Sequence, residues 1–368
     1  MLSRNSVFGP TLSDKRLLTY PALEQHSEWE ELVRGIGLLV ALVAVFGAAL
    51  SAEERAGERS AGPPRRPVNT YSIVAQDPAT GALGVAVQSH WFSVGSVVSW
   101  AEAGVGAVAT QSFVEVSYGP LGLELMRSGK TASQALAALL AVDEHAAVRQ
   151  VAMVDRQGNV AVHTGDSCIA EAGHVTGEGY SVQANMMAQD TVPQAMAAAF
   201  DASDGDLAER LLAALDAAQG EGGDIRGRQS AAILVVPGES AGAPWRERQV
   251  DLRVEDHPQP VVELRRLVAV QKVYDHMNQG DELFADGDIE GALTAYATAA
   301  ELQPQSLEVR YWQAVTLVGA GRTEEALPIF RQVFAEGPEW RELTRRLPAA
   351  GLLPDEDGLL ARILGPDG

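Results

Sequence analysis

Short apolar runs separated by turn residues mark the part of the chain that begins near residue 69. TYSIVAQD and ALGVAVQS flank a DPATG turn, and this arrangement predicts a β-hairpin. VGSVVSWAEAG and VGAVATQSF follow and predict a second pair of strands, broken at AEAG. Because the runs are apolar on both alternating faces, we expect an antiparallel sheet of four strands that is buried on both sides and covered by helices.

Helical and strand patterns then alternate up to about residue 256. YGPLGLELMRSG predicts a helix that ends at Gly129, and TASQALAALLAVD predicts a second helix capped by Thr131. RQVAMVD and VAVHTG predict a hairpin, and GYSVQANMM predicts a strand. Two more helical segments, TVPQAMAAAFDAS and GDLAERLLAALDAAQ, precede the strands SAAILVV and RQVDLRVED. This order is typical of an α+β fold with two sheets face to face and helices outside.

From residue 261 the pattern becomes helical and acquires an internal period. Residues 286–305 align with residues 320–339 at an offset of 34, and the period resembles that of tetratricopeptide repeats, which are helix–turn–helix units. The aligned pairs are Gly287 and Gly321, Ala292 and Ala326, Leu293 and Leu327, and Pro304 and Pro338. We expect a small all-α repeat domain at residues 261–345, followed by a C-terminal tail at residues 346–368.

Stacked repeats form a concave groove that commonly binds a peptide, so a peptide or protein partner is one expectation for this domain. The alternative is that the stack packs on the first domain or mediates self-association, and a homodimer is compatible with the sequence. Acidic residues dominate the repeats, and no basic clamp for a carboxylate stands out.

The net charge of −21 is concentrated after residue 68. Residues 1–68 carry 8 Lys+Arg and 8 Asp+Glu, so the remaining 300 residues carry the whole acidic excess. A body this acidic repels phosphate backbones, which argues against a nucleic-acid partner. The single cysteine, Cys168, excludes an internal disulfide and a CxxC zinc site, and the seven histidines form no HExxH motif. We therefore expect neither a metal nor a cofactor.

The N-terminal part reads as a targeting segment. Residues 35–52, GIGLLVALVAVFGAALSA, contain no charge and fit either a cleaved signal peptide, with cleavage before Ala52, or a retained membrane anchor. Residues 1–34 form a long extension that carries acids (Glu28, Glu30 and Glu31) where a signal peptide has positive charge, and a true start at Val33 would remove nearly all of it. Residues 53–68 are charged and proline-rich, as in a linker. Export to the periplasm or outside the cell is the favoured expectation, and contact with a membrane would involve only residues 35–52.

Several blocks of residues 69–256 resemble the family known as domain of unknown function 1028. These blocks are TYSIVAQDPATGALGVAVQS, AEAGVGAVATQSF, YGPLGLELMRSG, TGDSCIAEAGHVTGEGYSVQANM and GGDIRGRQSAAILVV. The family is grouped with the N-terminal-nucleophile (Ntn) hydrolases, so the resemblance implies a four-layer αββα sandwich. It also implies that Thr70, which opens the first strand, would be a nucleophile with its own α-amino group as base. That role requires a cut after Asn69, and without it Thr70 is a β-branched residue at a strand start.

Other candidate site residues come from strand ends and a glycine-rich loop. Asn185 lies in an apolar stretch, where its amide is either an oxyanion donor or a structural group. Arg226 and Arg228 lie on a loop that suits a carboxylate or another anion, or forms a charged surface. The remaining candidates for lining a cleft are Ser89, His90, Thr110, Gln111, Gln229 and Ser230.

Two functions of different classes follow from these observations. The first is an exported Ntn-type amidohydrolase that acts on a small amide or peptide, with repeats that dock a partner. The alternative is a non-catalytic sandwich that binds a small ligand or serves as a scaffold together with its repeats. The discriminating feature is whether Thr70 becomes N-terminal.

Overall fold

The computed structural model describes residues 66–68 and 70–365. The predicted N-terminal extension, apolar segment and most of the linker, residues 1–65, lie outside the described residues, as do Asn69 and residues 366–368. Among the described residues, no helix is both long enough and apolar enough to cross a membrane.

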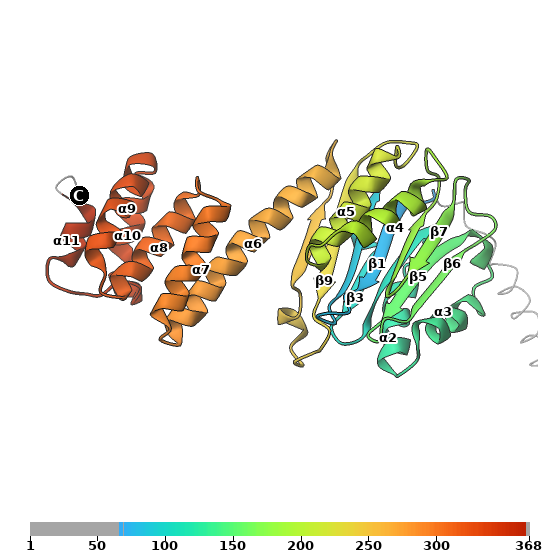
Figure 1. Cartoon of the computed structure of the whole chain (residues 1–368), viewed down its shortest axis with the longest axis horizontal. Coiled ribbons are helices and arrows are strands. Elements are labelled where there is room, and N and C mark those ends of the chain that lie inside the picture. The colour runs from blue at the N-terminus through green and yellow to red at the C-terminus, as the bar shows by residue number, and fades with distance from the viewer. Residues whose placement is uncertain (1–65, 69, 366–368) are drawn as a thin grey trace, which may run out of the picture. The chain divides into compact units, whose positions relative to one another are not determined.

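Two antiparallel sheets form the first part of the described chain (Figure 1). The six-stranded sheet has the order β10 (Val250–Val254), β9 (Ser230–Val236), β2 (Leu83–Ser89), β1 (Thr70–Gln76), β8 (Tyr180–Ala184) and β7 (Gly173–Gly177). The four-stranded sheet has the order β3 (Ser99–Glu102), β4 (Gly106–Ser112), β5 (Arg149–Asp155) and β6 (Val160–Thr164). The four strands predicted at the start of the domain therefore divide between two sheets, which corrects the expectation of one sheet.

Helices cover the outer face of each sheet, and Figure 1 shows them on opposite sides of the sandwich. Helices α2 (Tyr118–Arg127) and α3 (Ala132–Leu140) pack on the four-stranded sheet, while α4 (Val192–Ala202) and α5 (Leu207–Gly220) pack on the six-stranded sheet. Three apolar cores separate the four layers, one under each helix pair and one between the sheets. The predicted four-layer αββα sandwich is confirmed.

The caps of these helices follow from the sequence. Thr131 accepts a hydrogen bond from the backbone N–H of Gln134, whose side chain bonds back, and Asp206 forms the same reciprocal cap with Glu209. Such caps satisfy backbone groups that a helix start otherwise leaves unpaired. The 3-10 turns Val94–Ser96 and Pro244–Arg246 lie between strands of the sandwich, and Ala146–Val148 lies between α3 and β5.

A helical region follows the last strand. Helix α6 (Pro260–Ala285) packs on β9 and β10 through Leu264 and Val268, and its later part pairs with α7 (Ile289–Leu302). The next pair is α8 (Leu307–Gly319) and α9 (Thr323–Glu336), followed by α10 (Glu339–Arg346) and the 3-10 turn Pro348–Ala350.

Equivalent residues perform equivalent tasks in the two helix pairs. Gly287 and Gly321 adopt φ values of 86° and 75° at the turns before α7 and α9, a backbone conformation that favours glycine. Ala292 and Ala326 are both fully buried where paired helices approach. The segment expected as a C-terminal tail contains one more helix, α11 (Leu359–Leu364), because Leu359 and Ile363 complete the apolar core around α9.

Candidate functional site

The side chains in the layer between the two sheets change from apolar to polar along β1. Tyr71, Ile73 and Ala75 point into the core under α4 and α5, so the alternate residues Thr70, Ser72 and Val74 face the other sheet. The same alternation on neighbouring strands brings further polar side chains into this layer. Together the fully buried polar residues at this end are Thr70, Ser72, Ser89, Gln111, Gln150, Ser181, Gln183, Asn185 and Ser230.

A hydrogen-bonded network of amides joins the two sheets at this end. The Gln111 Nε2 group donates to Gln150 Oε1 at 2.7 Å, and Ser72 Oγ donates to Gln111 Oε1 at 2.6 Å. Gln183 Nε2 donates to Ser72 Oγ at 2.6 Å, and Asn185 Nδ2 donates to Gln150 Oε1 at 2.9 Å. Because buried amides are costly unless paired, this network satisfies most of the polar groups that the layer contains.

The network fixes the backbone of Thr70. Its carbonyl accepts hydrogen bonds from Gln111 Nε2 at 3.2 Å and from the Asn185 backbone N–H at 3.1 Å. Its hydroxyl donates to the Val68 carbonyl at 2.9 Å, and the residue is fully buried. The threonine expected as nucleophile thus lies at the centre of the polar end of the sandwich.

The segment before Thr70 covers that end in the continuous chain. Val68 forms an antiparallel bridge with Ser112 at the end of β4, with hydrogen bonds of 2.7 and 3.0 Å, and its side chain joins the inter-sheet core. The Arg66 guanidinium lies 5.7 Å from the centre of the Trp91 ring. Thr70 cannot meet a ligand through this side while residues 66–68 remain in place.

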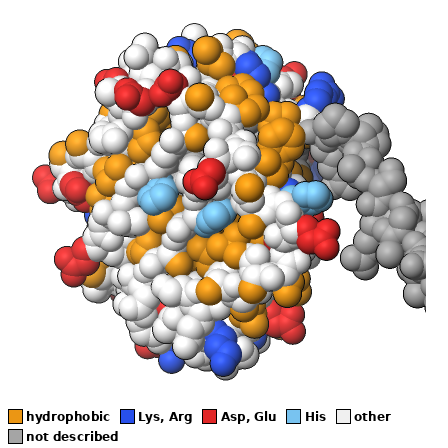
Figure 2. Space-filling model, turned by 90° about the vertical axis from the view of Figure 1, so that its right-hand side faces the viewer, with side chains coloured by type: hydrophobic (Ala, Val, Ile, Leu, Met, Phe, Trp, Pro, Cys, Tyr) orange, Lys and Arg blue, Asp and Glu red, His pale blue; other side chains and the backbone are white. Residues whose placement is uncertain are grey.

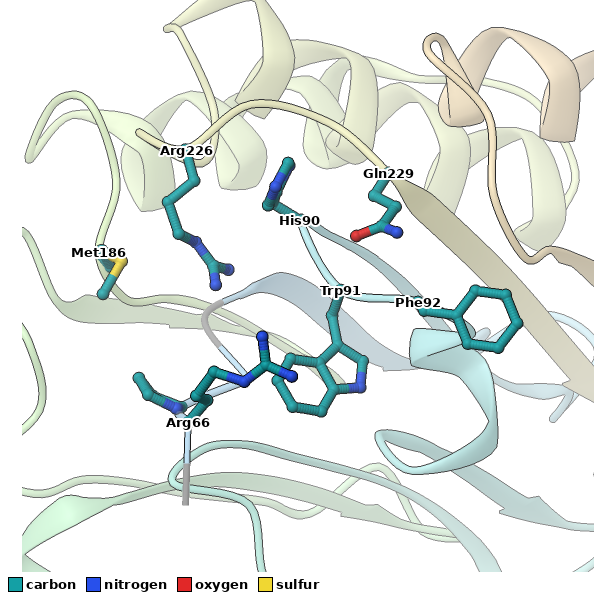
Figure 3. Close-up of a pocket in the computed structure, with 8 residues that line it drawn as sticks. Arg66, His90, Trp91, Phe92, Met186, Arg226 and Gln229 are labelled. Carbon is teal, nitrogen blue, oxygen red and sulfur yellow. The ribbon is translucent and has the colours of Figure 1, made fainter. Parts of the chain in front are cut away.

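A pocket of about 640 Å³ adjoins this segment. Figure 3 shows Arg66 lying against Trp91 on one side of the pocket, with Arg226 reaching towards the same space from the loop before β9. The residues that line the pocket are Arg66, Pro67, His90, Trp91, Phe92, Met186, Arg226 and Gln229. Apolar rings and a few polar groups converge here, as is common in small-molecule sites.

Asp224 fastens the loop that carries Arg226. Its buried carboxylate accepts hydrogen bonds from the backbone N–H of His90 at 3.1 Å and from that of Arg226 at 2.9 Å. The Arg226 guanidinium donates to the same carboxylate at 3.0 and 2.7 Å. The loop is therefore tied to the end of β2 by a charge-assisted clamp. Sequence reasoning missed Asp224, although an acid within the glycine-rich GGDIRGRQ stretch was a usable signal.

The other predicted residues divide into those at the site and those away from it. His90, Arg226 and Gln229 line the pocket, while Arg228 is exposed and is not among the lining residues. Ser89 and Ser230 face each other in the register of β2 and β9, and Ser230 accepts a hydrogen bond from the Val94 backbone N–H at 3.0 Å. Thr110 points the other way, towards α2, and its hydroxyl donates to the Glu115 carbonyl, because neighbouring strand residues face opposite sides. The structure brings Thr70, Gln111 and Asn185 together and leaves Thr110 outside.

Asn185 has a spare acceptor rather than a spare donor. Its Nδ2 group is engaged with Gln150, and within the part of the chain that the structure describes its buried Oδ1 has no hydrogen-bond partner. A buried amide oxygen without a partner is uncommon and marks a place where another donor is expected.

Backbone strain also gathers around this end. Over residues 66–68 and 70–365, three residues other than glycine have positive φ, namely Ser93 at 55°, Ser112 at 68° and Met186 at 58°. Ser112 pairs with Val68, and Met186 lines the pocket. Strained residues persist where the surrounding structure holds them, and they are frequent at functional sites.

The network continues outward to a pair of edge strands. Gln150 Nε2 donates to Thr164 Oγ1 at 3.0 Å, and that oxygen lies 2.9 Å from His174 Nδ1. Burial, together with the nearby His163, lowers the pKa of His174. Cys168 pairs with no histidine in the described structure; its thiol donates to the Arg149 carbonyl, and burial raises its pKa. Within the described ranges, no group of three metal-ligating side chains is assembled.

One face of the molecule is shown in Figure 2. Hydrophobic and histidine side chains lie near its centre, and most of the charged side chains, of both signs, lie towards its outline. The face in view therefore has a mixed character rather than a continuous basic stripe.

Family models match both the sandwich and the helical region. Residues 70–264 match the model of a family described as "Family of unknown function (DUF1028)", and residues 283–347 match a tetratricopeptide repeat model. A crystal structure of a protein from Silicibacter pomeroyi assigned to the same family is 35% identical, with a TM-score of 0.49, and the match covers 54% of this chain and 88% of that one.

A second solved structure is the ancestral beta-subunit Anbu from Yersinia bercovieri, which is 12% identical with a TM-score of 0.29 over 55% of this chain and 96% of that one. The search of curated proteins finds no match. Since the first family model spans more than half of the sequence, this chain belongs to the DUF1028 family of unknown function and carries tetratricopeptide repeats after its family domain.

Proposed function

We propose that the protein is an Ntn-type amidohydrolase that becomes active when the chain is cut before Thr70. The observation that carries this proposal is the burial of the Thr70 hydroxyl at the start of β1, in the one end of the inter-sheet layer that is polar. A structural role alone would be met by an aliphatic residue there, as it is by Val74 four residues further along the same face of β1.

The chemistry follows from the groups that a cut would create. The new α-amine of Thr70 would have a reference pKa of about 8, so it could take the hydroxyl proton near neutral pH. The hydroxyl oxygen would attack the amide carbon of the substrate, and the amine would pass the proton to the departing nitrogen. Water would then cleave the resulting ester and regenerate the free threonine.

Asn185 is assigned to positioning the new amine. Its Oδ1 is the acceptor left without a described partner, and its backbone N–H already bonds to Thr70. An ammonium or amine at Thr70 supplies the donor that this oxygen lacks. An oxyanion role for Asn185 would instead require its Nδ2 group to leave Gln150, which makes positioning the better supported role.

The substrate class is a small amide or peptide with an apolar portion. Trp91, Phe92 and Met186 offer apolar contact area, while Gln229 offers an amide for orientation. Removal of residues up to 69 would also remove Arg66 and Pro67 from the pocket and open the side on which Val68 now covers Thr70.

If the chain is never cut, the segment 66–68 that covers Thr70 favours a second function. In the continuous chain, the Thr70 nitrogen belongs to a peptide bond and its hydroxyl is occupied by Val68. The sandwich would then act as a non-catalytic module that binds a small ligand in the pocket beside Trp91.

The repeats supply a protein-interaction role in either case. Export through residues 35–52 stays a prediction, since residues 1–65 lie outside the described part of the chain. The formation of a homodimer also stays a prediction.

The test compares a protein that begins at Thr70 with the uncut chain on a library of amide and short peptide substrates. We expect hydrolysis only from the protein with a free Thr70 amine, retention of activity in Thr70→Ser, and loss in Thr70→Ala. Equal activity in Thr70→Ala, or activity in a chain that mass spectrometry shows to be uncut, would contradict the proposal.

A further inference from the structure

A second pocket, of about 480 Å³, lies in the helical region. It is formed by α6 and α8, the first helices of the two helix pairs, together with the turn that follows the 3-10 segment Pro348–Ala350. Its lining residues are Tyr274, Met277, Asn278, Asp281, Phe284, Glu308, Trp312, Val315, Thr316, Gly319, Gly351 and Leu352. The volume falls within the range of about 300–1,000 Å³ that is common for ligand pockets.

The charged side chains that line this pocket are all acidic. Asp281 and Glu308 are the only acidic or basic side chains that line it, and in the described structure neither forms an ion pair with a lysine or arginine. Other carboxylates of the repeats, such as Glu336 and Glu325, do pair with arginines. The pocket therefore holds uncompensated negative charge.

Tyrosines orient the two carboxylates without neutralising them. The Tyr274 hydroxyl donates to Glu308 at 2.7 Å, and the Tyr296 hydroxyl donates to Asp281 at 2.5 Å. The hydrogen bond to Glu308, with help from burial, raises the pKa of Tyr274, and burial followed by the bond to Asp281 raises that of Tyr296. Both tyrosines thus remain neutral donors, and each carboxylate keeps acceptor capacity for a further donor.

Aromatic walls complete the pocket. Tyr274, Phe284 and Trp312 line it, and Trp312 is held edge-on against Tyr311, with ring centres 5.2 Å apart. A Cβ atom added at Gly319 would lie 2.7 Å from Phe284 Cζ, so glycine at this position allows the ring to stand where it does. Aromatic faces attract cations, and the apolar stems of arginine and lysine pack well against them.

We propose that this pocket binds an arginine or lysine side chain, next to an apolar residue, in a polypeptide partner. The two carboxylates match the charge of the cationic head, and Met277, Val315 and Leu352 match the apolar neighbour. Arginine matches better than lysine, because its planar guanidinium can bond to a carboxylate and stack on an aromatic ring at the same time.

The proposal rests on the interaction role given to the repeats under the proposed function, and it names the chemistry of the partner. It does not depend on Thr70. Failure of the peptide to bind leaves the hydrolase assay unchanged, and a protein with Thr70→Ala is expected to bind the peptide as the wild type does.

The experiment measures fluorescence polarisation of fluorescein-labelled hexapeptide libraries on the full chain. One library has a central arginine flanked by Leu, Ile or Phe, a second has lysine, and a third has citrulline, which keeps the shape of arginine without its charge. We expect the citrulline library to bind at least about tenfold more weakly than the arginine library, and binding to weaken as salt rises.

The variants locate the binding. Glu308→Gln keeps an acceptor for Tyr274 but removes the charge, and we expect about fivefold weaker binding of the arginine library. Asp281→Asn is expected to act in the same direction. The matched control is Glu301→Gln, which removes one charge from an exposed position in α7 outside the pocket and should stay within about twofold of wild type. Circular dichroism melting of each variant verifies that the repeats remain folded.

Three outcomes would overturn the proposal. They are equal binding of the arginine and citrulline libraries, an equal loss in Glu308→Gln and Glu301→Gln, and the absence of binding by either cationic library at millimolar concentration. If arginine peptides instead dissociate a dimer seen by sedimentation, a second copy of the chain is the occupant, and the assignment to a separate partner falls.

Discussion

The two ends of the inter-sheet layer are built from the same strands but from opposite kinds of residue. At one end, Val74, Val85, Val154 and Leu234 form an aliphatic core. At the other end, amides and hydroxyls fill the same layer and are held by hydrogen bonds between the sheets. The change occurs along single strands, for example from Val154 to Gln150 on β5.

The two fillings place different demands on their neighbours. An aliphatic filling would stabilise the sandwich without any need for matched partners, whereas a buried amide network is stable only when nearly every member is satisfied. The network instead fixes the Thr70 carbonyl from two sides and leaves the Asn185 Oδ1 without a described partner. The aliphatic end therefore needs no matched partners, whereas the polar end fixes the backbone of Thr70 through specific hydrogen bonds.

The largest expected effect comes from the residue at the centre of the polar end. In the cut protein, Thr70→Ala should lower kcat by about a thousandfold or more, because the attacking hydroxyl is lost. Val74→Ala, four residues along the same strand, should lower stability but leave kcat nearly unchanged. Steady-state kinetics on both variants make the comparison, and a similar loss of kcat in both would remove the distinction between the ends.

The next effect concerns the network itself. Gln150→Leu preserves volume but leaves the Gln111 and Asn185 amides without their shared acceptor, so we expect a loss of about 3 kcal/mol in the free energy of unfolding. Val154→Ala, at the aliphatic end of the same strand, should cost about 2 kcal/mol through the cavity that it creates. Urea unfolding measures both, and a neutral or stabilising Gln150→Leu would show that the network is dispensable.

A smaller effect is expected from Asp224, whose carboxylate holds the Arg226 loop beside the polar end. Asp224→Asn retains the shape but weakens the bonds from Arg226 and the His90 backbone, which should cost about 1–2 kcal/mol. Since the loop lines the pocket, KM should rise more than kcat falls. The control is Asp251→Asn, which removes a carboxylate on β10 that pairs with Arg248 and Arg253 and does not line the pocket.

The smallest effect is a dependence of stability on pH at the outer end of the network. Burial and His163 lower the pKa of His174 below its usual 6.5, so the unfolded chain takes up this proton at a higher pH than the folded protein does. This contribution to stability is present above pH 6.5 and is lost as the pH falls through the lowered pKa. Urea midpoints measured from pH 8 to pH 5 should fall less steeply in His174→Asn, and an unchanged slope would contradict this assignment.

The sequence predicted the layers better than it predicted the site. Apolar runs located most strands, the capped helices were correct, and the period of 34 located the repeats, because each of these features is local. Strand β7 was missed, since GHVTG is a half-exposed edge strand with no apolar run. The division of the first four strands between two sheets depends on contacts distant in sequence, which no local pattern records.

The site depends on which face of a strand meets the other sheet. Thr110 and Gln111 are adjacent and both fully buried, so the sequence could not tell which of them faces the inter-sheet layer. Gln150 and Asp224 were missed for the same reason: their roles exist only through partners on other strands and loops. Thr70 could be identified only through the family resemblance.

The most direct test of the central claim is the N-terminal residue of the active protein recovered from its native host. Edman sequencing or intact mass should give a chain that begins at Thr70, with the hydrolase activity confined to that species. An active protein that retains residues 66–68 ahead of Thr70 would contradict the account, and the ligand-binding alternative would then take its place.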